Sequence, residues 1–295
     1  MTLLTKIQQK NYEAGEFSDL KERTYSETIG LIQNFPWLQQ REHISIGLTN
    51  PSITIEGSSG DYLKLAPYFN GKFVLYYVDT QNHLYTHSMA TISEAEPLIQ
   101  SFFEGRLNPT DLKREPTPFV DNRAQFQTRA FTYTMHATPT ILWVSFLSLL
   151  WLVFPLAGGI GALLSAPSPK MAVVLVLGMF IVVLITVAVL QLASTISHYR
   201  ASKGKFLSIS RGNPLFRFGN INAPATYDKK DIREIIQYSA YKGLEGLQRT
   251  QIIFNDNSEI NISGMIASTS TMSNKFPQVT IKQKTKAYPI LPVDG

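Results

Sequence analysis

The sequence contains no cysteine among its 295 residues. Disulfide bonds, thiol nucleophiles and thiolate metal sites are therefore excluded. Small domains outside the cell often depend on disulfides, so a disulfide-stapled exterior domain is excluded as well. This absence favours soluble parts that face the cytoplasm.

Ionisable side chains are absent from two long apolar blocks, Ile141 to Leu164 and Met171 to Ala193, which the six residues 165–170 connect. At 1.5 Å of rise per residue, each block forms a helix of about 35 Å, longer than the roughly 30 Å hydrocarbon core of a bilayer. A buried helical hairpin of a soluble protein is the alternative, but it needs a covering layer that the other residues do not supply. We predict a transmembrane hairpin over residues 139–195.

Catalytic motifs are also missing: there is no Gly-rich phosphate loop, GxSxG, HExxH or EF-hand pattern. His83 and His87 lie in a segment that reads as a strand, where residues four apart are roughly 13 Å from one another, too far to share one metal ion. We expect a non-enzymatic protein with no catalytic residue, no cofactor and no metal site.

Charge is divided unevenly along the chain. Residues 1–138 carry 12 Lys+Arg and 15 Asp+Glu, a net −3, whereas residues 196–295 carry 14 and 7, a net +7. The basic part directly follows the apolar blocks, which suits an anionic leaflet as partner. Nucleic acid is not expected, because the cations are spread out and no recognition helix accompanies them.

Orientation follows from the cations that flank the apolar blocks. Arg123 and Arg129 precede the first block, and four cations from Arg200 to Arg211 follow the second, whereas Lys170 is the one cation of the connection. Because cytoplasmic flanks carry the excess of Lys and Arg, both termini are predicted to be cytoplasmic. The first residues contain no signal-peptide pattern. The expected location is the cell (inner) membrane.

The first 138 residues read as a small α+β domain with a flexible leader before it and a linker after it. Residues 1–17 are the expected leader, residues 18–105 the domain, and residues 106–138 the linker and juxtamembrane segment. Asn70-Gly71 is a strong hairpin signal, because both central residues of a type I′ turn need positive φ. Within the domain we predict a helix that begins at Ser18, a second helix at 93–105 and a meander of four or five strands (44–48, 52–57, 61–69, 72–79, 83–89).

Small residues form spaced pairs in the first apolar block: Ala157 stands four before Gly161, and Gly158 four before Ala162. Such pairs let helices approach closely. They predict packing against the second block of the same chain or, alternatively, homo-oligomerisation through this face.

The part after the membrane segment has strand-like stretches at 206–210, 214–220, 231–240, 249–255 and 258–264. The entry KKDIREIIQY (Lys229 to Tyr238) and the hairpin QIIFNDNSEINIS resemble the bacterial pleckstrin-homology-like domains found beside membrane helices. The chain departs from that family at residues 265–276, which are Ser/Thr-rich where the family has an amphipathic helix. We expect a mostly-β domain over residues 200–286 and a tail at 287–295.

The resemblance implies a binding or scaffolding module, and some eukaryotic relatives bind phosphoinositides. The alternative is a juxtamembrane basic stripe that touches lipid without specificity. The residues expected to contact lipid headgroups are Arg200, Lys203, Lys205, Arg211 and Arg217.

The sequence therefore predicts an α+β membrane protein in which a two-helix transmembrane hairpin separates an α-β-α meander domain from a pleckstrin-homology-like β domain. Such a protein fits a membrane-anchored adaptor or regulator that binds a protein or lipid partner. The alternative hypothesis is an immunity protein that protects against a secreted or membrane-attacking bacterial toxin.

Overall fold

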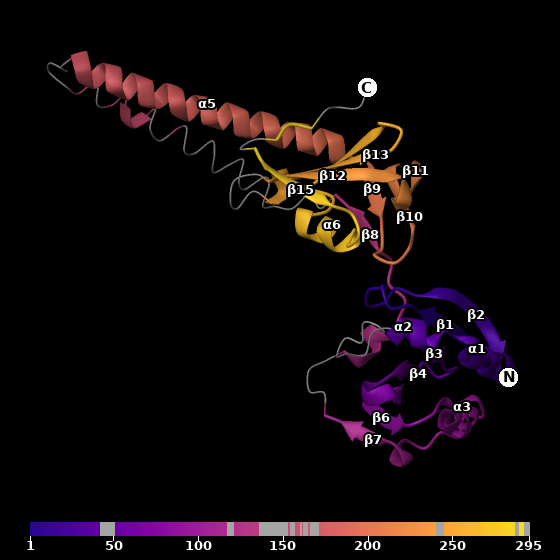
Figure 1. Ribbon diagram of the computed structural model, residues 1–295. Coiled ribbons are helices and arrows are strands. Elements are labelled where there is room, and N and C mark those ends of the chain that lie inside the picture. The colour runs from indigo at the N-terminus through magenta and orange to yellow at the C-terminus, as the bar shows by residue number, and fades with distance from the viewer. Residues whose placement is uncertain are drawn as a thin grey trace. The chain divides into compact units, whose positions relative to one another are not determined.

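The computed structural model describes residues 1–41, 51–116, 121–135, 153, 157–159, 161, 165, 171–239, 245–286 and 289–291 (Figure 1). The chain divides into two compact units. The N-terminal unit comprises Met1–Phe131 with Ser210–Asn213, and the C-terminal unit comprises Thr132–Ile209 with Pro214–Gly295.

The N-terminal unit is built on an antiparallel sheet of seven strands in the order β2-β1-β3-β4-β5-β6-β7. Each neighbouring pair is antiparallel, and the register from β3 to β6 is that of a simple meander. The strands are β1 (Thr2–Gln8), β2 (Ser18–Thr24), β3 (Ser52–Glu56), β4 (Tyr62–Pro67), β5 (Phe73–Val78), β6 (Leu84–Met89) and β7 (Lys113–Glu115).

Two predictions for the first residues are wrong. Residues 1–17 are not a loose leader, because β1 lies inside the sheet and pairs with both β2 and β3. No helix begins at Ser18 either, since Ser18–Thr24 form strand β2. The helix begins at Tyr25, where the Thr24 side chain and Glu27 form a capping box.

Helices cover one face of this sheet. They are α1 (Tyr25–Asn34), α2 (Trp37–Gln40) and α3 (Glu96–Phe103), and their apolar side chains pack on inward residues such as Ile53, Leu63 and Leu75. Asn70 and Gly71 both have positive φ, as predicted for the turn between β4 and β5. Predicted strands 52–57, 61–69, 72–79 and 83–89 are confirmed, and 44–48 lies outside the described residues.

The C-terminal unit contains two four-stranded sheets, in the orders β11-β10-β9-β8 and β14-β13-β12-β15. Their inward faces share one core that includes Leu207, Phe216, Ile235 and Ile252. The strands are β8 (Thr132–Thr134), β9 (Lys205–Ser208), β10 (Leu215–Asn220), β11 (Ala223–Asp228), β12 (Ile232–Ser239), β13 (Arg249–Phe254), β14 (Glu259–Ser263) and β15 (Ile281–Thr285).

Helix α5 (Met171–Ser202) contains the second apolar block and continues nine residues past its end. Strand β8 precedes the apolar blocks and β9 follows them, yet the two strands pair. The predicted start of this domain at residue 200 is therefore wrong: its first strand lies in the stretch 106–138 that was expected to be a linker. The same stretch also supplies β7 to the N-terminal sheet.

The end of the chain departs from two expectations. The Ser/Thr-rich stretch contains a helix, α6 (Thr269–Lys275), whose first turn the Ser268 side chain caps. Strand β15 then adds to β12 in parallel. Pro289 and Leu291 of the expected tail are buried. Short 3-10 turns occur at Phe69–Gly71, Ile92–Ala95, Pro109–Asp111, Asn122–Gln125, Lys229–Asp231 and Glu245–Leu247.

Candidate functional site

Helix α5 is the candidate membrane anchor. Among the described residues it is the one helix long and apolar enough to cross a membrane, over the 25 residues Gly178–Ser202. Large apolar side chains from Met179 to Leu192 are exposed around it. A helix that is apolar all round and uncovered by protein is suited to lipid.

The last turns of α5 differ from the apolar part, because they are buried in the C-terminal unit. Ser194, Ser197 and His198 are nearly inaccessible. His198 Nε2 donates to the carbonyl oxygen of Pro289 (2.8 Å), and the Ser194 hydroxyl donates to the same oxygen (2.9 Å). The helix is therefore fixed to the folded unit by hydrogen bonds and is not joined to it by a loose tether.

The basic residues predicted to contact lipid do not form one cluster. Arg200 and Lys203 are exposed at the end of α5. Lys205 Nζ lies 5.9 Å from the Phe218 ring centroid, and the Arg217 guanidinium lies 5.9 Å from the Phe206 ring centroid. In the register of β9 and β10, Lys205 and Arg217 fall on opposite faces of the sheet.

Arg211 belongs to the N-terminal unit, to which residues 210–213 are assigned. Its side chain donates to the carbonyl oxygens of Asn11 (3.0 Å) and Tyr12 (2.9 Å), and its backbone N–H donates to Glu13 Oε1 (2.9 Å). A guanidinium held in this way serves the fold of that unit. Its contact with lipid stays a prediction.

The small residues of the first apolar block are partly described. Ala157, Gly158 and Gly161 are helical and exposed, whereas Ala162 lies outside the described residues. The buried glycine is Gly159, where an added Cβ would lie 3.3 Å from Ile181 Cδ1 of α5. Gly159, which contacts α5, is therefore not one of the four small residues that the spacing predicted.

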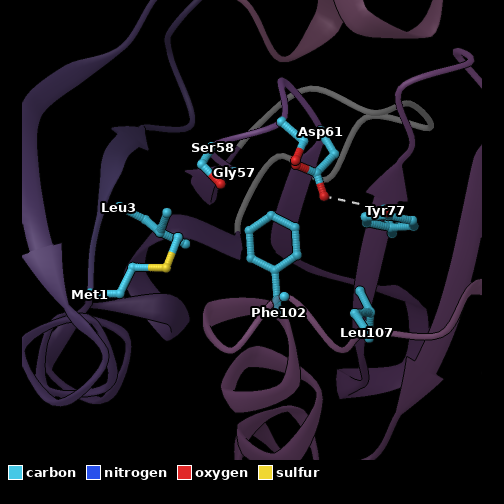
Figure 2. Close-up of a pocket in the computed structure, with 10 residues that line it drawn as sticks. Met1, Leu3, Gly57, Ser58, Asp61, Tyr77, Phe102 and Leu107 are labelled. Atoms are coloured by element: carbon cyan, nitrogen blue, oxygen red, sulfur yellow. Dashed lines mark hydrogen bonds between the residues drawn. The ribbon is translucent and has the colours of Figure 1, made fainter.

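The N-terminal unit has a small cavity of about 120 Å³ beside β4 and β5 (Figure 2). The Tyr77 hydroxyl donates to Asp61 Oδ2 at 3.4 Å. Burial, with the Asp61 carboxylate, raises the pKa of Tyr77 to about 12. Gly57 is required there because a Cβ would collide with Asp61 Oδ1. The cavity is smaller than the several hundred Å³ usual for ligand sites.

The second face of the N-terminal sheet carries a row of polar side chains that is buried at Lys6, Thr54 and Lys64. Lys6, Thr54, Lys64, Tyr76 and Thr86 stand directly opposite one another across five strands. Lys6 and Lys64 are at most 1% exposed. The Thr54 hydroxyl between them has no hydrogen-bond partner among the described residues.

The two lysines of this row are stabilised by different partners. Lys6 Nζ lies 3.3 Å from Glu56 Oε2. Lys64 Nζ donates to Gln8 Oε1 (3.1 Å) and stands 5.1 Å from the Phe126 ring centroid. Burial, with the nearby charge of Lys6, lowers the pKa of Lys64 to about 7. Because Lys64 is fully enclosed, its protonation affects the free energy of unfolding of the N-terminal unit.

In the part of the chain that the structure describes, no group of three or more His, Asp or Glu side chains gathers. His83 Nδ1 lies 3.0 Å from Asp79 Oδ2, in the turn before β6. His83 therefore contacts an acidic residue of its own turn.

Sequence reasoning missed the polar end of α5. The segment STISHYR directly after the apolar block places Ser194, Ser197 and His198 at helical spacing, and this cluster is the signal that a buried polar face follows the span. Their partners Ser263 and Pro289 are 65 to 95 residues away in the chain, so the contact itself could not be read from local pattern.

Comparison with known proteins supports the assignment of the C-terminal region. Residues 132–275 match a family model described as a PH domain. The match begins at β8 and ends at α6, so it spans the apolar blocks. No curated protein and no solved structure matches the chain.

Proposed function

We propose that this chain is a non-enzymatic, membrane-anchored interaction protein. Its apolar hairpin holds a PH-like domain and the N-terminal unit at the cytoplasmic face of the membrane, where they bind a protein or lipid partner. The family match of residues 132–275 supports the binding role, because PH domains are protein- and lipid-binding modules. The exposed apolar surface of α5 supports the anchoring role.

The observation that carries the proposal is the pairing of β8 with β9. Thr132 stands opposite Ser208, and Thr134 opposite Phe206, although the apolar blocks lie between these strands in the chain. Two paired strands lie on the same side of a membrane. A segment that leaves and rejoins one sheet must therefore cross the bilayer an even number of times. With α5 as one crossing, the proposal assigns the other crossing to the first apolar block.

Contact between the two apolar blocks agrees with this topology. Gly159 of the first block lies against Ile181 of α5. Removing a side chain at such a point lets two helices approach closely, as is common between membrane spans.

Orientation of the domain relative to the membrane follows from the end of α5. The hydrogen bonds of Ser194 and His198 to Pro289 join the helix to the unit immediately after the apolar block. A PH-like domain held in this way keeps the same end next to the apolar part of α5.

The test uses the full chain in cells and in membranes. Because the protein lacks cysteine, single cysteines report topology without background labelling. We expect Ser168→Cys, in the connection between the blocks, to react with a membrane-impermeant maleimide from outside the cell. Ser258→Cys, in the turn between β13 and β14, reacts only after the cells are opened.

The same chain should stay with the membrane after alkaline washing and leave it only in detergent. Extraction by alkaline buffer, or labelling of Ser258→Cys from outside, would overturn the proposal. A fusion of a reporter after Gly295 that is active only outside the cytoplasm provides the control for orientation and should give no signal.

A further inference from the structure

Strand β15 carries its positive charges on one side. Lys282 and Lys284 stand two residues apart in β15, so their side chains point to the same face of the sheet. Lys286, directly after the strand, continues this spacing. All three are exposed. The alternate residues face the other way: Ile281, before Lys282, packs on the core, and Gln283 donates to Gln237 Oε1 at 2.7 Å.

The neighbouring strands extend this basic surface. Lys284 stands opposite Tyr238 of β12, and Tyr238 stands opposite Arg249 of β13. The Arg249 guanidinium lies 5.1 Å and Lys284 Nζ 6.0 Å from the Tyr238 ring centroid. Two cations thus flank one aromatic ring at the same end of the sheet.

Acidic residues lie toward the opposite end of this sheet in its described part. Glu234, near the start of β12, pairs with Lys282. Glu259, at the start of β14, accepts from Gln251 Nε2 at 2.6 Å. Both of these acidic side chains have a partner near the start of β12, where Arg233 also lies, whereas Lys284 and Arg249 flank the end of β12.

The basic end is the one next to the apolar part of α5. Pro289, three residues after Lys286, accepts hydrogen bonds from Ser194 and His198, and Ser194 directly follows the last residue of the apolar block. Three extended residues span at most about 11 Å, so Lys286 lies within that distance of Pro289. Arg200 is about 9 Å farther along the helix axis from the block than Ser194.

We propose that Lys284 and Lys286, with Arg249 beside them, bind the anionic headgroups of the bilayer that α5 crosses. This inference rests on the proposed membrane anchoring. The surface lies largely outside residues 132–275 that match the PH-domain family, on a strand added in parallel at the edge of the sheet. Each cation near an anionic leaflet shifts the contact equilibrium about fivefold.

The experiment reconstitutes the full chain in vesicles of phosphatidylcholine alone or mixed with phosphatidylglycerol. A fluorophore on a flexible linker is attached to Thr285→Cys, which lies between the two lysines in the chain, or to Ser258→Cys at the other end of the sheet. Lipids with a spin label on the headgroup quench a fluorophore that touches the bilayer surface. We expect strong quenching at Thr285→Cys in the mixed vesicles only, and none at Ser258→Cys.

Charge variants identify the residues responsible. Lys284→Gln with Lys286→Gln removes two charges and should lower the contact equilibrium roughly 30-fold, so that quenching at Thr285→Cys is lost. Arg200→Gln with Lys203→Gln is the matched control, because it removes two charges from the end of α5, and it should leave the quenching unchanged. High salt should screen these charges and abolish the quenching, as Lys284→Gln with Lys286→Gln does.

Three outcomes would overturn the inference. They are equal quenching in both vesicle types, loss of quenching in the Arg200 and Lys203 variant, and persistence in the Lys284 and Lys286 variant. Flotation of every sample with its vesicles separates this failure from failure of the anchoring, because α5 alone keeps each variant in the membrane. A chain that does not float overturns both.

Discussion

His198 Nδ1 lies 2.8 Å from the hydroxyl oxygen of Ser263, so the last turns of α5 are joined to the end of β14. Because Nε2 donates its proton to Pro289, Nδ1 accepts the Ser263 proton, and the same hydroxyl accepts from the N–H of Met265 (3.1 Å). A single buried imidazole therefore connects the helix, the sheet and the end of the chain.

His198→Ala should destabilise the C-terminal unit. The change leaves buried polar groups on Ser263 and Pro289 without the imidazole, at a cost of about 1–3 kcal/mol. We expect a lower midpoint of thermal unfolding in detergent and faster hydrogen exchange at the Met265 amide. Tyr199→Ala, at a side chain that is 44% exposed, is the control and should change neither. An unchanged exchange rate in His198→Ala would show that the imidazole does not join these elements.

A disulfide between β8 and β9 should form without distortion. Thr132 and Ser208 stand opposite one another, and Cα atoms of opposed antiparallel residues are about 4.5–5.5 Å apart, within the range of a disulfide. Thr132→Cys with Ser208→Cys should lose both free thiols under mild oxidation, as counted by maleimide labelling. Thr132→Cys with Thr226→Cys, three strands apart, should keep both. Free thiols in the first variant would contradict the pairing on which the even number of crossings rests.

Gly159→Leu should weaken the contact between the apolar blocks. A Cβ at this position lies 3.3 Å from Ile181 Cδ1, and the larger side chain would force the helices apart, at a cost of about 1–3 kcal/mol. The matched control is Gly158→Leu, where nothing lies within 4 Å of an added Cβ. Thermal unfolding in detergent measures both. Ile181→Val removes the Cδ1 atom and should partly rescue Gly159→Leu, and a lack of rescue would place the defect elsewhere.

Lys64 should make the stability of the N-terminal unit depend on pH. Its pKa is lowered to about 7 by burial and by Lys6. Between this value and the usual pKa near 10.5, the unfolded chain binds the proton and the folded chain does not. The free energy of unfolding therefore falls as pH is lowered from about 10 to about 7, by on the order of 3–5 kcal/mol, and this effect is flat below 7.

Lys64→Met should abolish most of this slope, as measured by urea unfolding of the full chain in detergent at a series of pH values. Lys72→Met, at an exposed lysine of the β4–β5 turn, is the control and should keep the slope. A wild-type slope that survives in Lys64→Met would assign the pH dependence to another group.

Local patterns predicted much of both sheets. The turn at Asn70-Gly71 and the strands around it follow from turn chemistry and from alternation, which act over a few residues. Prediction failed where distant partners decided the structure. Thr2–Gln8 mixes apolar and polar residues without a clean alternation, and it becomes a strand because β2 and β3 hydrogen-bond to it on both sides.

The candidate surfaces divide in the same way. Arg200 and Lys203 were found from charge near the membrane segment, and they are exposed as expected for such residues. Lys282, Lys284 and Lys286 stand at alternate positions of the sequence. Their place beside α5, however, depends on hydrogen bonds from Ser194 and His198 to Pro289. No local signal reports a contact between residues so far apart in the chain.

The amino-acid sequence by itself determined that apolar blocks long enough to cross a bilayer divide two more polar regions, because length and hydropathy are properties of the chain alone. Only the tertiary structure decided that the blocks are inserted within the PH-like unit, between β8 and β9, and that the last turns of α5 belong to its core. Strand pairing and buried hydrogen bonds join residues that the sequence keeps apart, and their geometry is decided by the fold as a whole.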